Sequence, residues 1–470
     1  MAKDKKEIPF WAATGHKKPV TRRDFLSAGI IPFAANVFVP NWVSLMLGNN
    51  AQAADCPVPA SLIPMVTVSL SGGAAMAANY VPQNAARQPI ATYSKLGLGN
   101  NQVPIERAFG NSPWAGNGIS KFLAGIKAGA NATTMAKTAF IGFCVDSQND
   151  TNQNKFDVSG AVTKAGLVGA NIPNMGNRNT RTGMNQAAGF APPPAPLVVK
   201  NYSSLLTSIG SSIGYSASIG TALNASQKNS LVKLMSNLTE SQTRKIASLD
   251  GGSTVKTVLD CAGIKNVDVL AAGASVVDPR SNTTFANVWG INANTANTNR
   301  ELLFGSMLYN TLLGQAGAAN IELGGYDYHD GTRTSGDRRD LDAGTEVGRM
   351  LQSAAVLGKP LMIMVVSDGS VYSDASEARD AGWAGDRGHG VAYLFYFDPK
   401  GRPAVSDYQV GQFNDNQASD PKFVTGSNPE LVAAAVFANW CQANKRMDLF
   451  DKVGGRILDT SQLAQVIKVA

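Results

Sequence analysis

The chain has 470 residues, and only 16% of them are charged, well below the usual quarter. Lys and Arg number 41 against 34 Asp and Glu, but seven of the basic residues lie within the first 53 positions. The remainder has a small net charge and no basic cluster, so composition excludes nucleic acid as a partner.

The N-terminal segment, residues 1–53, predicts a signal for export. A lysine-bearing stretch leads into residues 21–26 (T-R-R-D-F-L), the twin-arginine consensus, and a mildly apolar run ends at residues 51–53 (A-Q-A), a small-x-small cleavage site. A membrane helix is the alternative, but Pro32 and Pro40 interrupt the run. We therefore expect the twin-arginine translocase as a partner during export, a periplasmic or extracellular location, and no membrane span after cleavage.

Beyond the signal, the apolar runs predict an α/β fold. Four of them have the length and composition of buried strands, and small or acidic residues follow each one: residues 65–70, 138–145, 361–366 and 391–397. A helix is predicted over residues 338–357, where apolar side chains recur at helical spacing: Leu341, Val347, Met350, Leu351 and Ala354. This alternation favours a doubly wound, mainly parallel sheet, which binds ligands at the carboxyl ends of its strands.

The middle and the end of the chain add two further expectations. A proline-rich stretch, a Ser- and Gly-rich stretch and a helical pattern over residues 222–269 follow one another. We expect residues 191–270 to be a loop-rich and helical insertion within a single large domain, residues 54–470. Near the C-terminus, Ser427 and Glu430 have the spacing of a capping box, which predicts the start of another helix.

The four cysteines contain no C-x-x-C pair, which excludes a zinc ribbon or a thioredoxin motif. Two disulfides are an option in an oxidising compartment, but twin-arginine substrates fold before export, so any bridge forms late. Cys144 and Cys441 lie inside apolar runs. We expect both to be buried free thiols.

Histidine is scarce, and its placement is informative. Outside the signal only His329 and His389 remain, and both lie in segments rich in Gly and Asp, residues 324–330 (G-G-Y-D-Y-H-D) and 385–390 (G-D-R-G-H-G). On an extended segment, an Asp-x-His pair points both side chains to one face, as a divalent metal would need. The alternative is a set of loop-capping aspartates and hydrogen-bonded histidines, and these residues alone leave both open.

One predicted strand ends in S-G-G at residues 71–73, and another ends in S-D-G at residues 367–369. Together with the two histidine segments, these motifs resemble the secreted "domain of unknown function 1501" family, a branch of the alkaline phosphatase and sulfatase superfamily. The resemblance covers most of residues 60–400. It implies a sheet of alkaline phosphatase-like type and, by analogy with the superfamily, acids and histidines that cradle divalent metals. The positions that match the family's metal motifs are Asp327 and His329 (F-D-T-H), Asp368 (S-E-F-G-R) and Asp386 (D-H-G), with His389 able to replace a missing histidine.

The departures from the family pattern are equally specific. Ala75 stands where the family has an acid, Arg387 stands where it has the D-H-G histidine, and residues 153–156 (Q-N-K-F) replace its R-S-H-F segment. The main hypothesis is therefore a protein with a degenerate site, holding at most one divalent ion and serving in binding or structure. The alternative is a metal-dependent hydrolase of phosphate or sulfate esters, with one or two metals held by the five matched positions.

Overall fold

The structure is a computed structural model, and nearly all of the residues it describes belong to one compact unit, Pro57–Ile219 with Ala272–Ala470. The predicted signal and almost all of residues 222–269 lie outside the described part. So do Cys56 and Cys261. The described ranges are 62–90, 105–116, 118–147, 154–169, 172–178, 185–192, 197–206, 230, 277–328, 333–373, 383–384, 390–414, 418–454 and 457–470.

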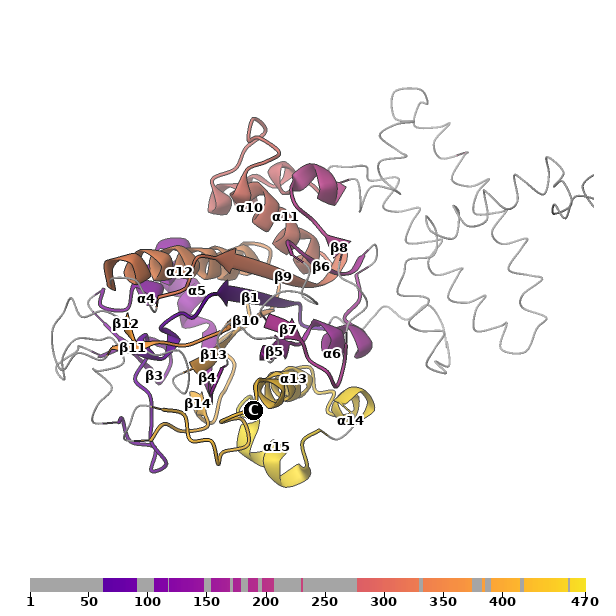
Figure 1. Cartoon of the computed structure of the whole chain (residues 1–470). Helices are drawn as coiled ribbons and strands as arrows, with labels where there is room; N and C mark the ends of the chain where they lie inside the picture. The colour runs from indigo at the N-terminus through magenta and orange to yellow at the C-terminus, as the bar shows by residue number, and fades with distance from the viewer. Residues whose placement is uncertain are drawn as a thin grey trace, which may run out of the picture. The chain divides into compact units, whose positions relative to one another are not determined.

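An eight-stranded sheet forms the centre of this unit, in the order β14-β4-β13-β10-β1-β9-β6-β8 (Figure 1). All neighbouring strands are parallel except where β13 pairs with β10 and with β4. A mainly parallel α/β sheet is thus confirmed, with one antiparallel strand. The strands are β1 (Met65–Ser71), β4 (Thr138–Val145), β6 (Ile172–Gly176), β8 (Leu197–Val198), β9 (Ala316–Gly324), β10 (Leu361–Ser367), β13 (Gly390–Phe397) and β14 (Gln409–Val410).

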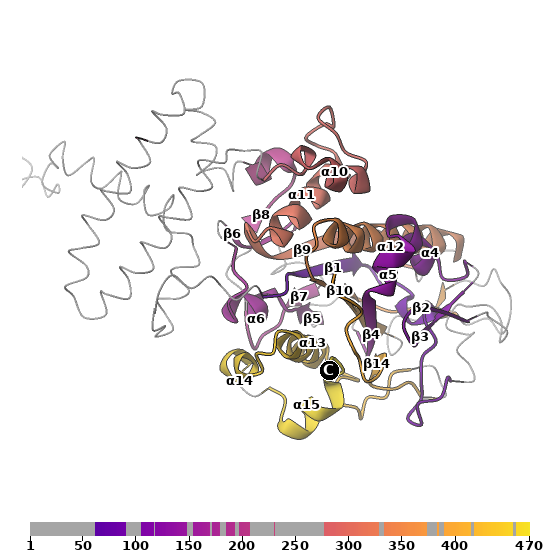
Figure 2. The same cartoon turned by 180° about the vertical axis from the view of Figure 1, so that it is seen from behind.

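Helices cover both faces of the sheet, as Figures 1 and 2 show from opposite sides. This cover explains why β4, β10 and β13 are buried along their whole length and have continuous apolar sequences. One face carries α4 (Lys121–Gly129), α5 (Ala132–Ala136), α10 (Thr283–Trp289), α11 (Arg300–Leu312) and α12 (Arg333–Val356). The other carries α6 (Ser159–Lys164), α13 (Pro429–Ala443), α14 (Asp448–Gly454) and α15 (Thr460–Val466).

Shorter elements complete the unit. Two 3-10 turns, η1 (Met76–Ala78) and η4 (Pro279–Ser281), precede α4 and α10 respectively in the chain. Three two-stranded pairs lie outside the main sheet: β2 (Ile105–Phe109) with β3 (Ser112–Ala115), β5 (Asn154–Asp157) with β7 (Asn185–Ala187), and β11 (Tyr372–Ser373) with β12 (Trp383–Ala384). Within the ranges given above, no helix is both long enough and apolar enough to cross a lipid bilayer.

Helices α4 and α12 approach each other through glycine. A Cβ on Gly344 would overlap the carbonyl of Phe122, and a Cβ on Gly125 would overlap the carbonyl of Leu341. The two backbones therefore touch, which only residues without a side chain permit.

The helix predicted over residues 338–357 is confirmed, although it begins earlier, at Arg333. The expectation that Leu341 lies on its apolar face is wrong: this side chain is 41% exposed, since its backbone rather than its side chain faces α4.

The capping box predicted for the C-terminal helix is wrong. Helix α13 begins one residue later, with Asn428 as its N-cap and Pro429 in its first turn. The side chain of Asn428 accepts a hydrogen bond from the Glu430 amide. The Glu430 carboxylate instead accepts from the Phe190 amide at 2.8 Å, so it fastens the segment after β7 rather than capping its own helix.

Two cysteines lie in the described part, and both are free and buried as predicted. Cys144 belongs to β4, between β13 and β14, and Cys441 belongs to α13. Burial raises the pKa of each thiol well above its ordinary value. Because the thiolate is the reactive form, we expect both thiols to react slowly and to serve in packing.

Candidate functional site

The carboxyl ends of β9, β1 and β10 meet at one edge of the sheet. These strands are parallel neighbours, with Ser71 of β1 beside Gly324 of β9 and Leu70 of β1 beside Ser367 of β10. The chain passes from β9 through α12 to β10, so it crosses over β1. In open α/β sheets ligands bind outside the carboxyl ends of the strands. Antiparallel β13 brings its first residue, Gly390, to the same edge, beside Val145 of β4.

Gly72, directly after β1, is the point where two predicted site residues converge. Its amide donates a short hydrogen bond to Oδ1 of Asp368, whose side chain is fully buried. A Cβ on Gly72 would overlap the amide of Asp327 and would lie 2.7 Å from its Cβ. With φ at +129°, the backbone there also adopts a conformation that favours glycine. Gly72 is therefore contacted by the backbone of Asp327, a residue that is itself exposed, and by the buried carboxylate of Asp368.

The loops that follow β1 and β9 run side by side beyond the sheet. The amide of Tyr326 donates to the Ser71 carbonyl at 3.0 Å, and the amide of Tyr328 donates to the Gly73 carbonyl at 3.4 Å. Side chains of an extended segment alternate between its two sides. The two tyrosines therefore lie on one side of the segment and Asp327 lies on the other.

The tyrosine side of this segment faces α12. The Tyr328 hydroxyl donates to Oδ1 of Asp340 at 2.8 Å, while the Tyr326 hydroxyl is 3.5 Å from Oδ2 of Asp342, at the limit for a hydrogen bond. The amide of the Asn79 side chain also reaches Asp340, 3.4 Å from Oδ2. Burial raises the pKa of Asp340 to about 7 against these hydrogen bonds.

Residues 153–156, which we aligned with the R-S-H-F motif of the resembled family, include the start of β5, and their side chains bond to the protein itself. The side-chain amide of Asn154, at the serine position, donates to the backbone carbonyl of Asp368 at 3.2 Å. Lys155, at the histidine position, is 3.6 Å from the Glu430 carboxylate. Ala75, at the position of the family's first acid, is 1% exposed and has no polar side-chain atom.

Two of the five predicted metal ligands, Asp327 and Asp368, lie in the described part, and both contact Gly72, the first through its backbone and the second through its carboxylate. His329, Asp386 and His389 lie outside the described residues. In the described ranges, no three His, Cys, Asp or Glu side chains gather as a metal ion would require. Asp340 is not among the residues predicted from the sequence, although a signal for it exists. It lies seven residues before Val347 on the buried face of α12, so it is a carboxylate at a core position.

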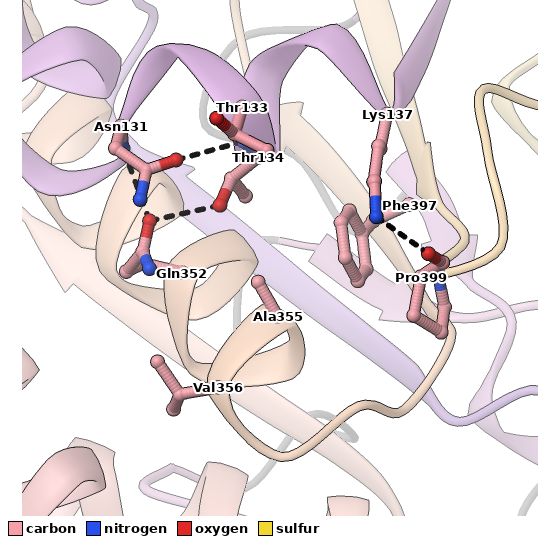
Figure 3. Close-up of a pocket in the computed structure, with 9 residues that line it drawn as sticks. All are labelled: Asn131, Thr133, Thr134, Lys137, Gln352, Ala355, Val356, Phe397 and Pro399. Atoms are coloured by element: carbon pink, nitrogen blue, oxygen red, sulfur yellow. Dashed lines mark hydrogen bonds between the residues drawn. The ribbon is translucent and has the colours of Figure 1, made fainter.

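The hollow in Figure 3 lies elsewhere. It has a volume of about 240 Å³ and lies beside the far ends of β13 and α12, where Phe397 pairs with Thr138, the first residue of β4. Its polar groups bond one another: the Thr134 hydroxyl and the Asn131 amide both donate to Oε1 of Gln352. The lining residues are Asn131, Thr133, Thr134, Lys137, Gln352, Ala355, Val356, Phe397 and Pro399. We place the candidate site at the carboxyl edge, where the carboxylates are.

No known protein family, no curated protein and no solved structure matches the chain in comparisons with each. The arrangement around Gly72 is therefore the basis for any statement about function.

Proposed function

We propose that this chain is an exported protein of alkaline phosphatase-like type that binds one divalent cation through Asp327 and Asp368 and does not turn over phosphate or sulfate esters. The observation that carries the proposal is that Asp327, through its backbone, and Asp368, through its carboxylate, both contact Gly72, which places the two acidic residues at one point of the sheet edge. Hard divalent cations prefer carboxylate oxygens and complete their coordination with water. A cation held there would polarise a bound oxygen ligand.

The absence of turnover is supported by what stands at the family's other positions. Two-metal ester chemistry needs about six ligands and an activated nucleophile. Ala75 supplies no ligand atom, and the amide of Asn154, which replaces the serine, is bonded to the Asp368 backbone. Lys155, which replaces the histidine, lies beside Glu430 of α13. These residues contribute to the fold, so we propose a binding or structural role.

The test is the metal content of the chain after export by its native route. We expect at most one divalent ion by elemental analysis and near-background hydrolysis of generic phosphate and sulfate esters. Asp327→Asn and Asp368→Asn should each weaken Mn²⁺ binding about tenfold or more, because loss of a ligand or its support has that effect. Asp451→Asn, which changes an exposed carboxylate on α14, is the matched control and should bind as the unchanged protein does.

Two outcomes would contradict the proposal. Two tightly held ions with strong esterase activity would favour the hydrolase alternative and would indicate further ligands such as Asp146. No bound ion, and none taken up in a Mn²⁺ titration, would leave Asp327 and Asp368 as structural residues.

The sequence-based expectation for His329 is tested in the same assay. His329→Ala should remove the bound ion, because water replaces an imidazole ligand poorly. An unchanged metal content would exclude His329 from the site while leaving the two carboxylates in place.

A further inference from the structure

One buried carboxylate on α12 joins the two loops that form the candidate site. Asp340 is 6% exposed, and each of its oxygens is reached from a different loop. Oδ1 accepts from the Tyr328 hydroxyl, in the loop after β9, and Oδ2 accepts from the side-chain amide of Asn79, in the loop after β1. Asn79 is itself held by the Ser120 hydroxyl at 2.7 Å. Asp340 therefore connects both loops to the helical layer.

Stability alone is a poor explanation for this carboxylate. A buried charge is costly unless it is paired, and both hydrogen-bond donors to Asp340 are neutral. An apolar side chain of similar volume at a helix position facing the core would avoid that cost. The arrangement is better explained by what the two donors hold.

Each of the two donors holds one of the two loops that touch at Gly72. Tyr328 directly follows Asp327 and points to the opposite side of the segment, so its hydroxyl bond fixes how far Asp327 extends toward Gly72. Asn79 follows η1 in the loop that begins with Gly72, so its bond fixes the other partner. A single carboxylate thus sets the position of Asp327 relative to the amide that holds Asp368.

We infer that Asp340 is a positioning residue for the cation site, which holds Asp327 in place through Tyr328 without touching the ion. The inference rests on the proposed function. It predicts that cation affinity depends on the Tyr328 hydroxyl, which lies on the far side of the segment from the carboxylate that binds.

The test compares two identical chemical changes two residues apart. Tyr328→Phe removes the 2.8 Å bond to Asp340, and Tyr326→Phe removes only the 3.5 Å contact with Asp342. Both tyrosines are buried, so both variants lose a hydroxyl from a similar environment. Calorimetric titration with Mn²⁺ should show affinity about tenfold weaker for Tyr328→Phe and for Asp340→Asn, as is typical when the support of a ligand is lost. Tyr326→Phe should bind within about twofold of the unchanged protein.

A second measurement separates positioning from general destabilisation. Ser353→Ala removes another buried hydrogen bond of α12, the 2.8 Å bond from the Trp289 indole, far along the helix from Asp340. It should lower stability without changing Mn²⁺ affinity. Amide hydrogen exchange at Tyr326 and Tyr328 should accelerate in Asp340→Asn and not in Ser353→Ala, because only the former leaves one acceptor oxygen for the two donors that hold the loops.

The outcomes are distinguishable. Unchanged affinity and exchange in Tyr328→Phe and Asp340→Asn would overturn the inference, as would an equal loss of affinity in Ser353→Ala. If the unchanged protein takes up no Mn²⁺, the proposed function fails and the role in cation binding fails with it. Hydrogen exchange would then still report whether Asp340 holds the loop.

Discussion

The two ends of the central sheet differ in the side chains that surround them. At the carboxyl edge of β1, β9 and β10, Gly72 contacts the backbone of Asp327 and donates to the buried carboxylate of Asp368. At the other end, near Phe397, a hollow of about 240 Å³ is lined by side chains whose polar groups bond one another. Helix α12 reaches both, with Asp340 at the first and Gln352 at the second. The comparison teaches that a hollow whose polar groups bond one another is weaker evidence for function than two acidic residues whose loops meet at one glycine.

The largest expected effect belongs to Gly72, where the carboxyl edge is most crowded. Gly72→Ala should lower the free energy of unfolding by about 3 kcal/mol or more, because the new Cβ overlaps the Asp327 backbone and φ is positive. Gly401→Ala is the control, since φ there is +156° and nothing lies within 4 Å of the new Cβ. Urea unfolding of both variants measures the difference. Equal losses would show that backbone strain, and not the contact with Asp327, makes Gly72 necessary.

The second-largest effect expected is a dependence of stability on pH at the carboxyl edge, which the hollow should not show. The pKa of Asp340 is about 7 in the folded protein and near 3.8 in an unfolded chain, so the folded state binds the proton more tightly. Its contribution to stability is complete below about pH 4 and is lost as the pH rises through about 7. Between pH 5 and 7 the protein should therefore lose on the order of 2 kcal/mol that Asp340→Asn does not lose. Urea unfolding at both pH values tests this, and parallel losses in the two proteins would contradict it.

The smallest effect is expected at the hollow. Gln352→Ala removes the acceptor shared by the Thr134 hydroxyl and the Asn131 amide, so it should cost about 1 kcal/mol of stability. The loss should be the same at pH 5 and 7, because an amide does not titrate, and Mn²⁺ affinity should not change. A marked change in Mn²⁺ binding would break the distinction between the two ends of the sheet.

The strands were predictable because helices cover both faces of the sheet, which demands continuous apolar runs such as β4 and β10. The antiparallel direction of β13 was not, since a run buried on both faces has no feature that marks its direction. The error at α13 is of another kind. Ser427 and Asn428 are both good N-caps, and Pro429 decides between them because it suits the first helical position.

At the candidate site, motif and topology together placed Asp327 and Asp368 after parallel strands that end at one edge, and the structure has both strands there. The role of Asp340 was not predicted. It depends on Tyr328 and Asn79, which reach it from distant parts of the chain, and only the packed structure shows that they meet.

The contact between α4 and α12 has a consequence for the order of folding. Its halves come from opposite parts of the chain, and glycine offers no side chain to attract the other helix before the backbones are close. Contacts between distant segments form late, because the intervening chain must first be ordered. Contacts absent from the folding transition state mainly slow unfolding. The glycine contact should therefore slow unfolding more than it speeds folding. We expect Gly344→Ala to leave the folding rate nearly unchanged and to make the protein unfold faster.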